Sequence, residues 1–211
     1  MKKKFVVILA LFIFAIFISG CINILPTQED DSITPGKGRL KIYLADSSEK
    51  YKANDSEIYL KVNITIYKIE VHLAGEDEED EGEWIELELN NGEKIFDLID
   101  LKNEGLSVLL SEVELPPGKY TQIRLFVKDA SVDIEEGDSG VPVEIPSADQ
   151  TGIKLIHPSE IIEGETTELT IDFDAEKSII KTGNGTYKLM PVIKITSTIV
   201  INTTENDNEN E

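Results

Sequence analysis

The side chains that could do chemistry in this chain are mainly carboxylates. The 211-residue sequence contains 41 Asp and Glu residues, two histidines and a single cysteine. Asp172 and Asp174 alternate with apolar residues in a predicted strand, which would place both on one strand face about 6–7 Å apart. They are candidates for a metal pair or for a polar cluster around Lys177. The alternative without a functional role is a pair of exposed acids at the edge of a sandwich.

A second group of acids forms the run Glu76–Glu83, which the pattern places in a loop between strands. Hard carboxylate oxygens in a flexible loop suit Ca²⁺. The run lacks the spacing Asp-x-Asp-x-Asp-Gly of a calcium loop, so a solvated loop is favoured over a calcium site. We therefore expect no metal and no cofactor.

Other catalytic residue types are scarce. His72 ends an amphipathic strand and His157 precedes Pro158, positions that favour structural or exposed histidines over general bases. The sequence has no Gly-x-Ser-x-Gly, no glycine-rich phosphate loop and no His-Glu-x-x-His. Trp84 could stack on a sugar ring, although core or edge packing is the commoner role of a tryptophan in a sandwich. These features predict a protein that is not an enzyme.

Charge and cysteine content exclude further classes. A formal net charge of −21 repels phosphate backbones, which excludes nucleic acid as a partner. One cysteine excludes an intramolecular disulfide and a cysteine-based zinc centre.

The N-terminus has the pattern of an export signal. Three lysines precede the apolar stretch Phe5–Ile18, which is shorter than the roughly 20 residues of a spanning helix but suits a secretory signal peptide. The stretch ends in Ile18-Ser-Gly-Cys21, which resembles the lipobox of secreted lipoproteins, where the cysteine is lipidated and becomes the new N-terminus. We expect a signal peptide over 1–20 and a domain held on the extracytoplasmic face of the cell membrane by lipidated Cys21. An uncleaved N-terminal anchor is the alternative.

The exported part divides into three segments. Residues 21–37 have the composition of a flexible tether, residues 38–201 form the folded domain, and residues 202–211, which hold no apolar side chain, predict a disordered acidic tail. Four Asn-x-Ser/Thr sequons, at Asn54, Asn63, Asn184 and Asn202, are expected acceptors of N-glycans if the host glycosylates exported proteins.

The domain has the two-residue apolar period of β-strands. Apolar residues alternate with polar ones around Leu40–Leu44, Ile58–Ile66, Ile123–Val127 and Leu169–Phe173, and the phase shift after Ile66 predicts a bulge or a switch between sheets. No stretch predicts a convincing helix; Leu106–Val113 has room for a turn or two. The pattern therefore predicts an all-β Greek-key sandwich of nine or ten short strands.

Turn residues support this fold. Asn90-Asn91-Gly92 and Asn184-Gly185 predict tight hairpins, and residues 136–140 are expected to join two more strands. Leu115-Pro-Pro-Gly-Lys-Tyr120 fits the pattern of a tyrosine corner, in which the phenol hydroxyl bonds to backbone a few residues upstream. A plain Pro-Gly turn before a strand is the alternative.

Six segments of the domain look familiar as a set: Gly38–Asp46, Ile69–His72, Leu115–Arg124, Gly152–Leu155, Asp172–Ser178 and Met190–Ile193. Together they resemble a family of archaeal and bacterial lipoprotein domains, domain of unknown function 4382. The resemblance covers nearly all of residues 38 to about 195. It implies a β-sandwich similar to transthyretin-like and carboxypeptidase-regulatory-like domains, and it carries no established activity or site residues.

These observations predict a cell-surface lipoprotein whose sandwich is a non-catalytic binding or interaction module for a protein or glycan ligand. Two alternatives stay open. One is a structural envelope component that assembles through sheet edges, and the other is a Ca²⁺-dependent module that uses Asp172, Asp174 or the acidic loop.

Overall fold

The computed structural model describes residues 32–47, 59–77, 80–137, 139–146 and 151–202. The predicted signal peptide, Cys21, most of the tether, Asn54 and residues 203–211 of the predicted tail lie outside these ranges. Within them, no helix is both long enough and apolar enough to cross a membrane.

The regular structure of the described chain is mostly strands, with two short helices. The elements are β1 (Gly38–Ala45), β2 (Lys61–Leu73), β3 (Glu83–Leu87), β4 (Lys94–Asp97), α1 (Leu98–Glu104), β5 (Ser107–Leu115), β6 (Gly118–Asp133), β7 (Val141–Glu144), β8 (Ile153–Ile161), β9 (Glu165–Phe173), α3 (Ala175–Ser178), β10 (Ile179–Lys181), β11 (Tyr187–Leu189) and β12 (Ile193–Asn202).

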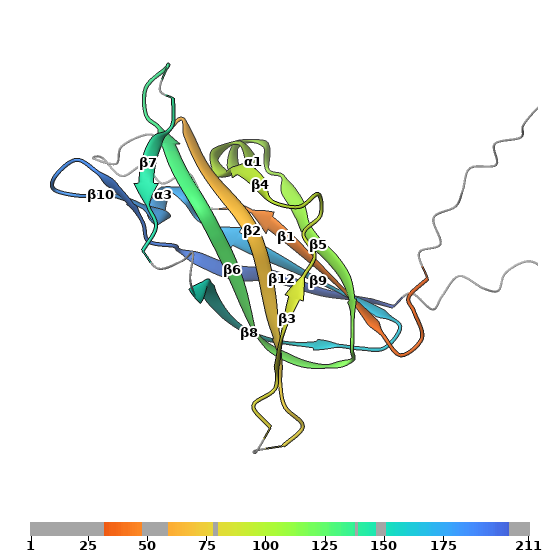
Figure 1. Cartoon of the computed structure of the whole chain (residues 1–211). Helices are drawn as coiled ribbons and strands as arrows, with labels where there is room; N and C mark the ends of the chain where they lie inside the picture. Colours follow the sequence, from red (N-terminus) through yellow and green to blue (C-terminus); the bar gives the residue numbers. More distant parts are fainter. Residues whose placement is uncertain (1–31, 48–58, 78–79, 138, 147–150, 203–211) are drawn as a thin grey trace, which may run out of the picture. The chain divides into compact units, whose positions relative to one another are not determined.

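The strands form two sheets. One has the order β12-β9-β1-β5, and the other has the order β10-β11-β7-β6-β2-β3, with β4 added to β2 and β8 added to β6. β1 is parallel to β9 and antiparallel to β5, so strands far apart in the sequence lie side by side. Figure 1 shows the long strands β2 and β6 crossing in front of β1, β9 and β12. The all-β sandwich predicted from the sequence is confirmed.

A single apolar core joins the two sheets. The inward rows are the alternating residues that the sequence pattern had selected, among them Leu40, Ile42, Ile123, Leu125 and Phe173, all at most 3% exposed. Burying these side chains supplies most of the driving force for folding, at roughly 25 cal/mol per Å² of apolar surface.

The phase shift after Ile66 is a bulge rather than a change of sheet. The pairing of β2 with β6 shifts register on both sides of Ile66, and β2 continues along the same neighbour to Leu73. The inserted residue lets Ile64, Ile66 and Ile69 all point into the core, because it resets the inward phase of the strand.

The prediction of a tight hairpin at Asn90–Gly92 is wrong, because the strands on either side of this turn do not pair with each other. Asn91 and Gly92 do adopt positive φ angles, but β3 and β4 both pair with β2, end to end along one edge, and not with each other. The Asn90 N–H donates to Leu110 O of β5, and Ser111 Oγ donates to Glu88 O. The turn therefore loops out to the edge strand of the other sheet, which a local turn signal cannot reveal. The hairpin at Asn184–Gly185 and the β6–β7 connection are confirmed.

The prediction that the domain contains no convincing helix is also wrong. α1 lies just before the expected Leu106–Val113 turn, and most of that segment is β5. The Asp97 side chain accepts a hydrogen bond from the Ile99 N–H, and Gly105 ends the helix with a left-handed φ of 64°. An Asp at the N-cap and a Gly after the last turn are local helix signals that strand alternation on both sides concealed.

The tyrosine corner is present. Tyr120 is 3% exposed, and its hydroxyl donates to Pro116 O at 3.0 Å. Burial, together with the charge of Glu83, raises the pKa of Tyr120 from 10.0 to about 12. The neutral phenol is thus held in the native state as donor to the turn before β6.

Replacing Tyr120 with phenylalanine should lower the free energy of unfolding at pH 7 by about 1 kcal/mol, because it removes one hydrogen bond and keeps the ring. Urea unfolding measures this. Because the pKa is raised on folding, the contribution of Tyr120 is fully present below pH 10 and is lost as the pH rises to about 12, so Tyr120→Phe should lack this alkaline loss. Pro116→Ala keeps the acceptor carbonyl and serves as control. An unchanged unfolding midpoint in Tyr120→Phe would contradict the role given to the hydroxyl.

Candidate functional site

Asp172 and Asp174, the candidate metal pair, are buried rather than exposed, and they do not share a strand face. β9 is an interior strand between β12 and β1, and the two aspartates are 3% and 8% exposed. Asp174 lies beyond the end of β9 and caps α3 by accepting the Lys177 N–H. The expectation of a sandwich-edge pair is therefore wrong, because the strand ends at Phe173 and the backbone turns into a helix.

Each carboxylate is engaged by the chain's own donors. Asp172 Oδ1 accepts the Ser47 N–H at 2.7 Å, and Asp172 Oδ2 lies 3.5 Å from Lys194 Nζ. Asp174 Oδ2 accepts from Lys177 Nζ at 2.6 Å. The predicted polar cluster around Lys177 is thus half right, because Lys177 takes Asp174 while Asp172 pairs with Lys194.

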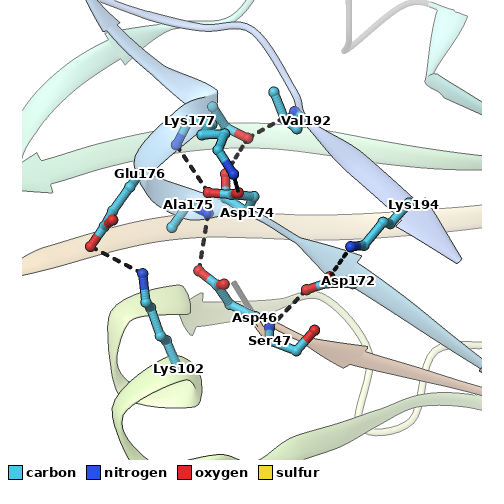
Figure 2. Close-up of polar contacts among 11 residues, drawn as sticks. Asp46, Ser47, Lys102, Asp172, Asp174, Ala175, Glu176, Lys177, Val192 and Lys194 are labelled. Atoms are coloured by element: carbon cyan, nitrogen blue, oxygen red, sulfur yellow. Dashed lines mark hydrogen bonds and ion pairs between the residues drawn. The ribbon is translucent and has the colours of Figure 1, made fainter. Parts of the chain in front are cut away.

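A third buried aspartate, Asp46, completes a clamp between β1 and α3. Asp46 Oδ2 accepts the N–H of Ala175, while the next residue, Ser47, donates its N–H to Asp172 (Figure 2). The end of β1 therefore holds the start of α3, and the end of β9 holds the end of β1. Charge-assisted hydrogen bonds of this kind are stronger than neutral ones.

Ser178, which is fully buried, ties the following loop to α3. Its hydroxyl donates to Asp174 O at 2.6 Å and accepts the Val192 N–H at 2.8 Å, and its carbonyl accepts the Met190 N–H. Three of the segments that carry the family resemblance, Gly38–Asp46, Asp172–Ser178 and Met190–Ile193, therefore meet at this cluster.

A hollow of about 340 Å³ adjoins the clamp. Its walls are Ala45–Ser47 at the end of β1, Gly105–Ser107 between α1 and β5, and Lys102 of α1; we call it the β1-end hollow. The Lys102 side chain is only 5% exposed, and its Nζ lies 3.1 Å from Glu176 Oε1. This ion pair engages the buried ammonium and ties α1 to α3.

The cap of α1 places Lys102 in the hollow. Asp97 Oδ1 accepts from Ile99 N and from Val62 N, which fixes the helix against β2. Burial raises the pKa of Asp97, and these backbone hydrogen bonds oppose the rise. The first turn of α1 buries Leu98, Ile99 and Leu101 in the core, so that Lys102 follows toward α3.

The sequence-based interpretation missed this hollow. Asp46 lay at the end of a strand without any assigned role, and Lys102 lay in a segment for which no helix was predicted. The N-cap Asp97 and the C-cap Gly105 were the signals that could have placed Lys102 on a helix.

The chain matches the family described as a domain of unknown function (DUF4382) over residues 37–191. This chain belongs to the DUF4382 family. No curated protein and no solved structure matches it. The match spans the clamp and the β1-end hollow together, so both are parts of the DUF4382 domain itself.

In the acidic loop of this DUF4382 domain, aspartate carboxylates accept hydrogen bonds from backbone N–H groups of the same loop. Asp80 accepts the N–H groups of Glu76 and Gly82, which lowers its pKa, and Asp77 accepts the N–H of Asp80. Residues 78–79 of the expected loop lie outside the described ranges. Among the residues that are described, no group of three or more His, Cys, Asp or Glu is arranged to hold a metal ion.

His72 and Trp84 pack on the outer face of the β3-β2-β6 sheet. The two rings lie 4.8 Å apart, and the Arg124 guanidinium lies 3.6 Å over the indole. His72 Nδ1 is 3.0 Å from Thr121 Oγ1 and Nε2 is 3.1 Å from Glu81 O, an arrangement that fixes the ring. Arg124 covers one face of the indole, so Trp84 packs against its neighbours on the sheet.

His157 lies within β8, next to Pro158. Both histidines are therefore on the sheet of β6 and β8, while the β1-end hollow is built from β1, α1 and β5. The DUF4382 domain does not bring either histidine to the hollow.

Three of the four sequons can be placed. Asn63 is inside β2, Asn184 lies in the β10–β11 turn, and Asn202 is the last residue of β12. The Asn184 side chain is an acceptor for the hydroxyls of Thr182 and Thr186 within its turn. Of the two whose burial is described, Asn184 is exposed and Asn63 is half-buried.

The Asp174 cap gives a direct test of the clamp. Asp174→Ala should lower the free energy of unfolding by about 1–2 kcal/mol, because it removes the N-cap of α3. Asp174→Asn should cost less than half as much, since asparagine also caps and the largely exposed Lys177 partner contributes little. Urea unfolding at pH 7 measures both. Equal losses in the two variants would show that the charge, and not the cap, is what stabilises the turn.

Proposed function

We propose that this chain is a lipoprotein held at the extracytoplasmic face of the cell membrane through Cys21, and that its sandwich is a non-catalytic binding module. Two sets of observations support the two halves of this proposal. The only cysteine of the chain follows Ile18-Ser-Gly, after a basic start and an apolar stretch of signal-peptide length. The hollow carries binding groups without a catalytic pair beside them.

The single observation that carries the binding half is Lys102. The Lys102 side chain, whose ammonium is ion-paired with Glu176 at 3.1 Å, lines a hollow that also contains Asp46 and two serines, so that polar side chains gather around one concave wall. The nearby carboxylates Asp172 and Asp174 are engaged by backbone N–H groups and lysines, and the walls of the hollow hold serine hydroxyls but no histidine. This arrangement favours holding a ligand over activating a nucleophile.

The lipid anchor is tested by labelling cells with an alkyne fatty acid and separating membranes from the soluble exported fraction. The wild-type chain should carry the label and remain in the membrane pellet, while Cys21→Ala should carry no label and leave the pellet. A matched control is Cys21→Ala combined with Ser32→Cys, which restores a thiol outside the lipobox and should not restore the label. Retention of Cys21→Ala in membranes with unchanged mobility would contradict lipidation and favour the uncleaved anchor.

The binding half is tested with the full chain in detergent on glycan and protein arrays. We expect a reproducible ligand class that the wild-type chain binds and that competes in solution. Failure to bind across broad panels of both kinds would contradict a binding module.

One observation favours a second candidate, a structural envelope component that assembles through a sheet edge. β12 has ten residues, is rich in isoleucine, threonine and valine, and pairs only with β9 among the strands described. Long edge strands of this composition are templates for pairing with another chain. Two of the other edges are interrupted, since Pro158 lies in β8 and the Glu88–Asn90 segment bonds to β5. Native mass spectrometry and cross-linking in membranes distinguish the two, because a persistent monomer is incompatible with edge assembly.

A further inference from the structure

The outer face of the sheet that contains β8, β6, β2 and β3 is turned away from the core, and Figure 1 views the molecule from this side. Val71, Ile123 and Leu155, on three of these strands, point into the core and are at most 8% exposed. Because side chains in a strand point alternately to its two faces, their neighbours along each strand point outward. The strand register then decides which outward residues lie side by side.

One row of outward residues crosses the four strands and has apolar side chains at its two ends. From β8 to β3 the row runs Ile156, Gln122, His72 and Trp84. Ile156 is 81% exposed, the highest value among the large hydrophobic side chains of the described chain. Trp84 is half-buried, with the Arg124 guanidinium over one face of its ring. An exposed aliphatic side chain and an aromatic–arginine stack therefore lie at opposite ends of one row.

The neighbouring row is charged, with its positive half on β8 and β6 and its negative half on β2 and β3. It runs Lys154, Arg124, Glu70 and Glu86. Its middle is engaged within the chain, because Glu70 pairs with Arg124 at 3.6 Å and with Lys68 at 3.0 Å. Its two ends, Lys154 and Glu86, are exposed. The charges of the row cancel, whereas the whole chain has a net charge of −21, so two copies repel each other less at this face than elsewhere.

We propose that two copies of this chain form a dimer through this outer face, related by a two-fold axis that runs parallel to the strands. Such an axis lays β8 of one copy over β3 of the other, so each row meets the same row in reverse order. Ile156 then packs on the stack of Trp84 and Arg124 of the second copy, and Lys154 faces Glu86 of the second copy. Both contacts occur twice, as in every two-fold interface.

The charges select this axis over the alternative. A two-fold axis in the same plane but perpendicular to the strands lays each strand over its own copy. Lys154 would then face Lys154 and Glu86 would face Glu86, and like charges in contact repel. Exposed ion pairs add little affinity, so the charged row sets the orientation, while the apolar row and the buried area hold the two copies together.

The face is large enough for a specific dimer. Four strands spaced about 4.8 Å apart give a width of about 19 Å, and the nine residues of β8 span about 30 Å. Covering this face buries about 500 Å² on each copy, so the total reaches the roughly 1,000 Å² expected of a specific interface. Tryptophan and arginine, which form the stack at one end, are among the residue types that carry most of the binding energy in such interfaces.

The same axis places the starts of both β1 strands at one end of the dimer. Leu73 pairs with Tyr120 and Gly118 pairs with Ile161, so β2 ends, β6 begins and β8 ends at a common end of the sheet. Gly38, the first residue of β1, lies against Ile161 at that end. An axis parallel to the strands keeps this end on the same side in both copies, which suits two chains anchored in one membrane. This agreement draws on the proposed anchor, whereas the contacts of the dimer do not.

Sedimentation equilibrium of the full chain in density-matched detergent tests the dimer across a series of concentrations. The wild-type chain should pass from monomer to dimer as its concentration rises. Trp84 is the only tryptophan of the chain, so its emission should shift to longer wavelength on dilution, when its contact with the second copy is lost. Ile156→Asp should raise the dissociation constant at least about tenfold, because it places an unpaired charge against the indole of the second copy. Met190→Asp, at a 55% exposed side chain between β11 and β12, is the matched control and should dimerise as the wild type does.

Charge reversal tests the proposed axis. Lys154→Glu and Glu86→Lys should each raise the dissociation constant several-fold, because each puts like charges opposite each other. The double variant Lys154→Glu/Glu86→Lys should return it to within about twofold of the wild type, since the pair is restored with opposite signs. Such a rescue requires that the two residues face each other across the interface.

Thermal unfolding at concentrations where every variant is monomeric should match the wild type, because exposed side chains contribute little to the stability of one chain. The inference is overturned if the wild type is monomeric throughout the series, if folded Ile156→Asp dimerises as tightly as the wild type, or if the double charge reversal binds no more tightly than the single variants. An assembly that survives in Ile156→Asp would point to pairing of β12 edges instead. Fatty-acid labelling at Cys21 and the array experiment are independent of these outcomes, so failure of the dimer leaves the proposed anchor and binding module standing.

Discussion

Gly38→Ala is expected to lower the free energy of unfolding by about 3 kcal/mol, at the upper end of the range for overpacking a close contact. A β-carbon on Gly38 would lie 2.3 Å from Ile162 O and 2.6 Å from Ile161 Cγ2, and real β-carbon contacts essentially never fall below 3.0 Å. The nearest atom is a backbone carbonyl, which cannot swing away as the end of a side chain can. The first residue of β1 would therefore have to separate from the end of β8.

The position of Gly38 makes this separation costly. Gly38 pairs with Leu115 of β5, and the neighbouring Lys37 O accepts the Gly164 N–H. Urea unfolding with a two-state fit measures the loss. Gly183→Ala is the matched control, because a β-carbon on Gly183 would have no atom within 4 Å and the φ of this residue is not positive; it should change the stability by less than about 0.5 kcal/mol. Equal effects of the two substitutions would contradict a steric cause.

Phe173→Ala should lower the free energy of unfolding by about 3–5 kcal/mol, which is the range for removing a large, fully buried aromatic side chain. Phe173 is 0% exposed and is the last residue of β9, between the two aspartates Asp172 and Asp174. The substitution leaves a cavity at the point where β9 turns into α3. Loss of packing at this point should also loosen the clamp from Asp46 to Ala175.

Phe173→Leu separates packing from shape, since it restores most of the apolar volume and should cost less than about 2 kcal/mol. Ile156→Ala is the control for removal of an apolar side chain, because Ile156 is 81% exposed and should contribute almost nothing. Urea unfolding measures all three variants at pH 7. A Phe173→Ala variant as stable as Ile156→Ala would contradict the placement of Phe173 in the core.

The clamp gives a structural role to residues of the segment Asp172–Ser178, which is one of those that carry the family resemblance. Asp172 holds the Ser47 N–H, Phe173 fills the core, Asp174 caps α3, and Ser178 holds the Met190–Val192 loop. Each of these side chains has a defined partner in the folded chain. A segment that looks like a candidate metal site in the sequence is, in the folded chain, the joint between β9, α3 and the loop before β12.

Local patterns in the sequence determined much of the fold. The alternation of Leu40, Ile42 and Leu44, and of Leu169, Ile171 and Phe173, predicted strands whose apolar faces are buried, because side chains in a strand point alternately to its two faces. Leu115–Tyr120 predicted the tyrosine corner, because the hydroxyl and its acceptor are only four residues apart. Features of this kind depend on a few neighbouring residues and can therefore be predicted from the sequence.

Pairing between distant residues could not be predicted from local patterns. The Asn90–Gly92 turn has hairpin residues, yet β3 and β4 both bind β2, because the edge of a thirteen-residue strand accepts two short strands in line. α1 was not predicted because a helix of seven residues is too short to show a clear apolar periodicity. Its caps are therefore a stronger sequence signal than its periodicity.

The strands and the tyrosine corner could be predicted from the sequence, since each depends on residues that are close together in the chain. The burial of particular carboxylates, and the donors that hold them, follow from the packing of distant segments. Asp46 and Ala175 are 129 positions apart, and Lys102 and Glu176 meet only because α1 and α3 lie beside the end of β1. Burial and hydrogen bonding depend on neighbours in space, so the β1-end hollow and its buried lysine appear only once the two sheets have packed together.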